Sequence, residues 1–103
     1  MTVIVTAVFH PKEGAHDELV AALREGIPAV HEEPGCLLYA IHEASDGTIT
    51  MIEKWTTAES LDAHARGQAV AALNALVSAH LASPTIVTTM TPISAGTAEQ
   101  GAL

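Results

Sequence analysis

Two strand-like runs, residues 36–44 and 48–55, occupy the middle of the chain and are separated by Ser45-Asp46-Gly47. An Asp-Gly pair between such runs is typical of a β-hairpin, because glycine tolerates the positive φ that a tight turn needs. Residues 2–9 and 85–91 are also dense in β-branched side chains, which favour strands. The sequence therefore predicts four strands, with the hairpin as the second and third.

The interval before the hairpin has the pattern of an amphipathic helix. Its apolar residues recur at spacings of four, four and three, at Leu19, Leu23, Ile27 and Val30. We expect Pro28 to kink or shorten the last turn of this helix, because proline lacks the backbone N–H that the helix uses.

The interval after the hairpin also predicts helix. Thr56 and Glu59 fit a capping box, in which the hydroxyl accepts from a first-turn N–H and the carboxylate reaches back. A short helix to about His64 is expected, with a break or bend at Arg66-Gly67. A second helical stripe follows, carried by Val70, Leu73, Leu76 or Val77, and Leu81.

The resulting order is βαββαβ, which predicts an α+β, ferredoxin-like fold with an antiparallel sheet and both helices on one face. Residues 1–93 make one domain in this interpretation, and residues 94–103 are expected to form a flexible tail. The first strand is largely apolar on both faces, so the face without helices also needs a cover. A second copy of the chain, giving a homodimer, is the simplest cover.

Charge and cysteine usage restrict the function classes. The net charge is −8, and the four basic residues are scattered, which argues against a nucleic-acid partner. Cys36 is the only cysteine, and the N-terminus lacks the pattern of a signal peptide, so a cytoplasmic location is expected. No apolar run approaches the roughly 20 residues that cross a bilayer, so no membrane association is expected.

A two-residue turn at Asp46-Gly47 would place His42, Glu53 and Trp55 on one face of the hairpin, and Tyr39 on the other. Burial of an unpaired Glu53 costs several kcal/mol, so this residue is expected to serve as a structural acceptor, as a base or as an orienter of a histidine. Trp55 is equally consistent with a core anchor and with the wall of an apolar pocket.

His64 is the preferred candidate for chemistry, since an unperturbed imidazole titrates near neutral pH. A buried or surface histidine without a role is the alternative. The sequence has no closely spaced histidine pair and no second cysteine, so no metal site is expected. Glycine-rich nucleotide motifs and the Gly-x-Ser-x-Gly motif are also absent.

Several segments together resemble the antibiotic biosynthesis monooxygenase family. They are Glu33-Pro34-Gly35-Cys36-Leu37 followed by Tyr39, then Glu53-x-Trp55, then His64, and finally Pro84 before the last strand. The resemblance implies a dimeric α/β barrel in which two ferredoxin-like sheets pack face to face. It also implies oxidation of a small aromatic, phenolic or quinol-type substrate by O₂ without a cofactor, in a pocket between sheet and helices.

In that interpretation His64 is the catalytic base, and Trp55, Tyr39, His42 and Glu53 contact the substrate. The resemblance is incomplete, because Gln68-Ala69-Val70 stand where many relatives carry a further histidine and an aromatic residue. The positions used by a haem-degrading branch hold Ala7, His64 and Asn74, so haem is not expected. An isomerase or cyclase that uses the same pocket and a non-catalytic dimeric binding or stress-response protein are the competing hypotheses.

Overall fold

The computed structural model describes all residues, 1–103, and has the predicted βαββαβ order. The strands are β1 (Val3–Phe9), β2 (Cys36–Glu43), β3 (Ile49–Trp55) and β4 (Ile86–Met90). The helices are α1 (His16–His31), α2 (Ala58–Ala65) and α3 (Gln68–Val77), and a 3₁₀ turn follows at Ser78–His80. The fold is ferredoxin-like, with all neighbouring strands antiparallel in the order β2-β3-β1-β4.

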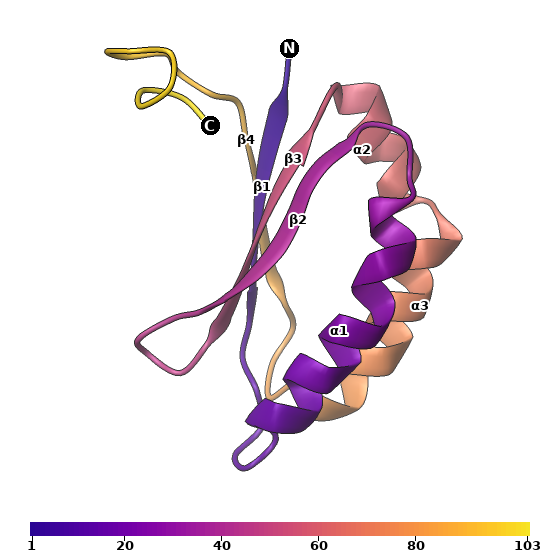
Figure 1. The fold of residues 1–103 in the computed structure, drawn as a ribbon. Helices are drawn as coiled ribbons and strands as arrows, with labels where there is room; N and C mark the ends of the chain where they lie inside the picture. The colour runs from indigo at the N-terminus through magenta and orange to yellow at the C-terminus, as the bar shows by residue number, and fades with distance from the viewer.

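The three helices lie on one face of the sheet (Figure 1). The predicted stripe on α1 is buried throughout, and Pro28 is accommodated inside the helix, which continues to His31. Gly26 lets α1 and α3 approach closely, since a Cβ atom at this position would lie 3.2 Å from the Cα atom of Leu73. The hydrophobic core therefore lies between these two helices and the sheet.

The second helical segment is broken in two at Arg66-Gly67, as the sequence predicts, and α2 and α3 result. The N-cap residue of α2 differs from the predicted one by one position. Thr57, not Thr56, has the extended backbone of an N-cap, and its Oγ1 accepts from the Ser60 N–H at 3.1 Å. Thr56 instead exchanges a hydroxyl hydrogen bond with Ser60, so the predicted capping box with Glu59 is wrong.

The register of the β2–β3 hairpin also differs from the prediction. Ala44 N–H donates to Thr48 O, so three residues, not two, form the loop, and Gly47 takes the left-handed conformation with φ +90°. Asp46 Oδ1 accepts from both the N–H and the hydroxyl of Thr48, which holds this longer loop. The one-residue shift pairs Tyr39 with Glu53 and His42 with Thr50.

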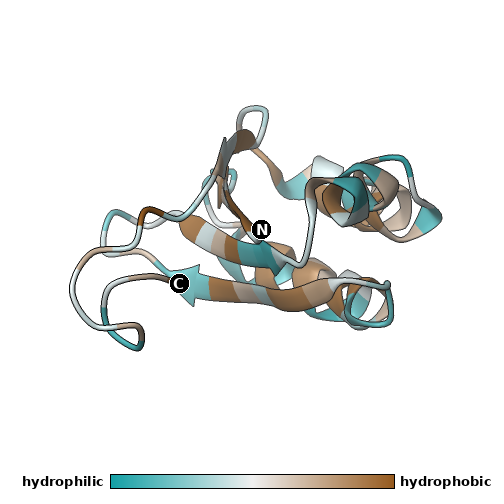
Figure 2. Ribbon diagram, turned by 90° about the horizontal axis from the view of Figure 1, so that it is seen from above, coloured by the Kyte–Doolittle hydropathy of each residue, from teal (hydrophilic) through white to brown (hydrophobic).

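The other face of the sheet has no helix over it, yet it is largely apolar. Cross-strand pairing places these residues on it: Ile4, Thr6 and Val8; Leu38, Ala40 and His42; Thr50, Ile52 and Lys54; Ile86, Thr88 and Met90. Hydrophobic stretches along the strands are visible in Figure 2, where the helices lie to one side only. Ile86 and Met90 of the edge strand β4 are 56% and 39% exposed.

Candidate functional site

A pocket of about 650 Å³ lies between the helices and the half of the sheet formed by β1 and β4. Of its 18 lining residues 11 are hydrophobic, and most of the lining comes from β1, β4, α2 and α3. Its lining also includes the acidic residues Glu53 and Asp62 and the imidazole of His64, but no lysine or arginine. The volume is that of a site for a small organic molecule.

His64 lies in the last turn of α2, lines this pocket and is only 5% exposed. Its ring lies against the indole of Trp55, with centroids 4.5 Å apart and planes inclined by 33°. The ring of Tyr39 meets it edge-on, with centroids 5.4 Å apart. Two aromatic side chains therefore fix the plane of the imidazole.

The imidazole is also fixed by a charged partner. His64 Nδ1 lies 2.6 Å from Glu33 Oε1, which comes from the loop between α1 and β2. An ionised carboxylate can only accept, so Nδ1–H donates to it. Nε2 has no hydrogen-bond partner within the chain and is not among the buried polar atoms left without one. Nε2 is thus the nitrogen available to a ligand.

Gly35 brings this loop close enough to α2. Its φ is +86°, and an added Cβ atom would lie 2.3 Å from Ser60 Oγ and 2.7 Å from Thr56 Oγ1. Glycine is required here both for the left-handed backbone and for the missing side chain. Gly35 O also accepts from the Thr56 N–H at 2.9 Å, which ties the loop to the start of α2.

Glu53 on β3 completes the polar end of the pocket. Its Oε1 accepts from Trp55 Nε1–H at 3.0 Å. The two residues are two positions apart on β3, so their side chains lie on the same face of the strand. Burial raises the pKa of the Glu53 carboxyl group, while the Trp55 hydrogen bond and nearby His64 act in the opposite direction. Burial also raises the pKa of the Tyr39 hydroxyl.

Four side chains therefore form one connected set, in the order Glu53, Trp55, His64, Glu33. Tyr39 packs against its middle, with its ring 6.4 Å from that of Trp55. The sequence prediction that Tyr39 faces away from Glu53 is thus wrong, because the hairpin register is shifted.

The predicted placement of His42 beside Glu53 and Trp55 is wrong for the same reason. His42 is exposed on the face of the sheet away from the helices, where its Nδ1 lies 3.2 Å from Thr50 O. Glu33 was not predicted as a site residue. Its partner His64 is 31 residues away in the sequence, and no local pattern indicates such a pairing.

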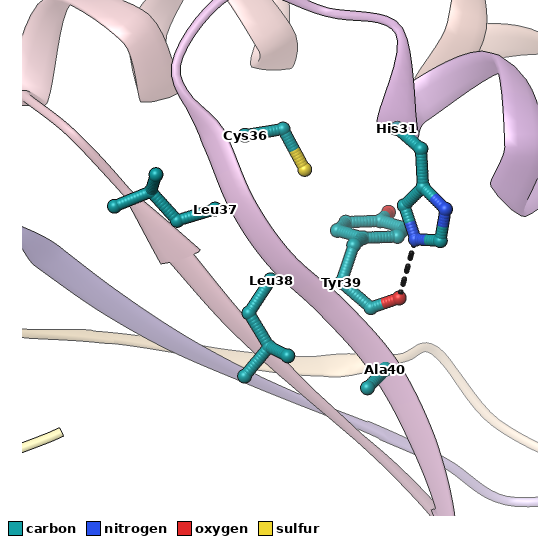
Figure 3. Close-up of a pocket in the computed structure, with 6 residues that line it drawn as sticks. All are labelled: His31, Cys36, Leu37, Leu38, Tyr39 and Ala40. Carbon is teal, nitrogen blue, oxygen red and sulfur yellow. Dashed lines mark hydrogen bonds between the residues drawn. The ribbon is translucent and has the colours of Figure 1, made fainter.

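A second pocket, of about 280 Å³, lies on the outer side of the edge strand β2 (Figure 3). His31 Nε2–H donates to Tyr39 O there and so ties the end of α1 to β2. Burial raises the pKa of the Cys36 thiol, which disfavours the nucleophilic thiolate. This pocket offers less for chemistry than the one that contains His64.

The structure also bears on metal binding and on membrane-spanning helices. No three His, Cys, Asp or Glu side chains converge in a way that could hold a metal ion. None of the helices is long and apolar enough to cross a membrane.

Fold and site together define a small ferredoxin-like protein with an apolar pocket that ends in an imidazole–carboxylate pair. The family model for antibiotic biosynthesis monooxygenase matches residues 2–76. The chain therefore belongs to the antibiotic biosynthesis monooxygenase family. This confirms the family inferred from the sequence.

Solved structures give the same result at the level of the fold. The Rv0793 protein of Mycobacterium tuberculosis is 28% identical, with a TM-score of 0.83, over 94% of this chain and 100% of that one. A structure described as an antibiotic biosynthesis monooxygenase is 27% identical, with a TM-score of 0.78, over 88% of this chain and 98% of that one. The SO0527 protein of Shewanella oneidensis is 26% identical, with a TM-score of 0.76, over 86% of this chain and 88% of that one. No curated protein matched the chain.

Proposed function

We propose that this protein is a monooxygenase that oxidises a small, neutral phenol or quinol with O₂, and that His64 is its general base. The observation that carries the proposal is that His64 lines a largely hydrophobic pocket while its Nδ1 is held by Glu33 and its Nε2 has no hydrogen-bond partner within the chain. An imidazole in this arrangement can accept the proton of a phenolic hydroxyl. Membership of the antibiotic biosynthesis monooxygenase family supports the same class of reaction.

The reaction is balanced without an external reductant. Proton transfer from a quinol hydroxyl to His64 gives an electron-rich anion, which reduces O₂. One oxygen atom forms a new bond to a ring carbon, and the other leaves as water. The quinol loses the four electrons that this requires and becomes a hydroxyquinone. The apolar side chains that β1 and α3 contribute to the pocket would keep other water away from the anion.

The charge of the pocket supports a neutral substrate. Its titratable lining residues are Glu53, Asp62, His64 and Tyr39, and no lysine or arginine is present to pair with a carboxylate, sulfonate or phosphate. The chain as a whole carries a net charge of −8. An anionic ligand would lose its hydration without gaining a counter-ion, which is unfavourable in an apolar site.

We further propose that the protein is a cytoplasmic homodimer in which the helix-free faces of two sheets pack together as an α/β barrel. The apolar side chains of that face, Ile86 and Met90 among them, support this arrangement. An exposed apolar surface of this kind is usually covered by a partner.

Oxygen uptake tests the proposed function. We expect the purified protein to consume O₂ with neutral benzo- or naphthohydroquinones, above the rate of their autoxidation, and not with sulfonated forms of the same rings. Quenching of the fluorescence of Trp55, the only tryptophan, reports binding in the same samples. Binding without uptake would favour a binding protein, and substrate conversion without uptake would favour an isomerase or cyclase. Either result would contradict the monooxygenase proposal.

A further inference from the structure

Glu33 lies behind His64 and has no access to the pocket. It is absent from the residues that line the pocket, while its Oε1 lies 2.6 Å from His64 Nδ1. Its side chain is 20% exposed, so the carboxylate is largely shielded from solvent. Glu33 therefore makes no direct contact with a ligand in this pocket, and its one side-chain contact at the site is with the imidazole.

The backbone of Glu33 is held on both sides. Its N–H donates to Val30 O at 3.0 Å, at the end of α1, and its carbonyl accepts from the Cys36 N–H at 3.2 Å, at the start of β2. Pro34 and Gly35 complete this short loop, whose close contact with α2 needs the missing side chain of Gly35. The carboxylate is thus presented by a fixed main chain rather than by a mobile one.

The second carboxylate oxygen lies against the beginning of α3. A Cβ atom added to Gly67, the N-cap residue of that helix, would lie 3.0 Å from Glu33 Oε2. A negative charge next to a helix N-terminus is stabilised by the unpaired N–H groups and the helix dipole. Glu33 is consequently placed as a fixed anion between α3 and His64.

We propose that Glu33 is the positioning residue of the site, which holds His64 in the tautomer with its proton on Nδ1 and with Nε2 as the free base. An imidazole without such a partner can place its proton on either nitrogen, and only one of the two tautomers can accept a proton from a ligand at Nε2. The aromatic contacts with Trp55 and Tyr39 fix the plane of the ring, and Glu33 determines which nitrogen carries the proton. The kinetic consequence rests on the proposed function, whereas the tautomer does not.

The variant Glu33→Gln tests this inference. A glutamine amide has the same shape but offers both an acceptor oxygen and a donor nitrogen, so it can serve either tautomer. Nitrogen NMR of the neutral imidazole should show a single Nδ1–H tautomer of His64 in the wild type and a mixture in Glu33→Gln. Glu32→Gln is the matched control, because Glu32 is the exposed neighbour with the same charge and has no hydrogen bond to His64.

Kinetics provide a second, separate readout. We expect kcat of Glu33→Gln for a neutral quinol to fall by about tenfold or more, because a wrong tautomer removes the base, while the dissociation constant from Trp55 quenching stays within about twofold of the wild type. A merely structural role would change both constants together. An unchanged tautomer in Glu33→Gln would overturn the inference even if oxygen uptake is found. A tautomer change in a protein that takes up no O₂ would support the positioning role and refute only the oxygenase.

Discussion

At the scale of single residues, Glu53 is an acidic side chain that is buried beside the pocket with a single hydrogen-bond donor. Glu53 is 5% exposed and its carboxyl group has one donor, Trp55 Nε1–H, so its ionised form is only partly compensated. Burial is the largest influence on its pKa and raises it above the ordinary value of 4.5. The sequence alone predicted that Glu53 needs a partner, and the tryptophan two residues later is that partner.

The raised pKa of Glu53 has a consequence for stability. The folded protein holds this proton more tightly than the unfolded chain does, so the free energy of unfolding falls as pH rises from about 4.5 through the folded-state pKa. The variant Glu53→Gln keeps an acceptor for Trp55 but cannot titrate. We expect the stability of the wild type to decrease relative to that of Glu53→Gln over this range, in urea unfolding at a series of pH values.

Glu59→Gln serves as the control for that measurement, because Glu59 is exposed on α2 and has no hydrogen bond within the chain. Its stability should follow the wild type at every pH. A constant difference between the wild type and Glu53→Gln from acid to neutral pH would contradict the account of Glu53.

His64 and Glu33 show which residue contacts sequence reasoning reaches and which it does not. The side chain of His64 could be singled out because its type suits acid–base chemistry and the family motif includes it. Glu33 could be quoted as part of a motif, but its role depends on a contact between a loop and a helix that are far apart in sequence. Such a contact follows from the tight packing at Gly35, which only the three-dimensional structure reveals.

At the scale of elements, strand and helix periodicity predicted all four strands and the break between α2 and α3. The hairpin register was wrong because an Asp-Gly pair is compatible with loops of two and of three residues. Thr48 decides between them, since its N–H and hydroxyl both bond to Asp46 Oδ1. A shift of one residue was enough to exchange Tyr39 and His42 between the faces of the sheet.

The helix-free face of the sheet gives the prediction that belongs to this scale. Ile86→Lys places a charge on the exposed edge of that face without touching the pocket. We expect this variant to sediment as a monomer at concentrations where the wild type is a dimer, because the charge would have to be buried in the interface.

The matched control is Ala21→Lys, which adds the same charge to an exposed position on α1. It should remain dimeric in analytical ultracentrifugation. A wild type that sediments as a monomer, or an Ile86→Lys variant as dimeric as the control, would contradict the proposed barrel.

At the scale of the whole molecule, one face of a four-stranded sheet carries the helices and the pocket, and the other face is free to pair with a second copy. The fold could be predicted because the order of strands and helices follows from local sequence patterns. The pocket could be predicted only in outline, because its volume depends on how α3 and β4 are spaced over β1.

Oxygen uptake by His64→Gln, measured beside the wild type and His80→Gln, tests the proposed role of His64 most directly. The glutamine can still donate to Glu33, so the fold should be kept, and His80 lies outside the pocket. We predict that His64→Gln binds a neutral quinol, as judged by Trp55 quenching, but consumes O₂ at least about a hundredfold more slowly, as expected for loss of a general base. Undiminished uptake by His64→Gln would contradict this prediction.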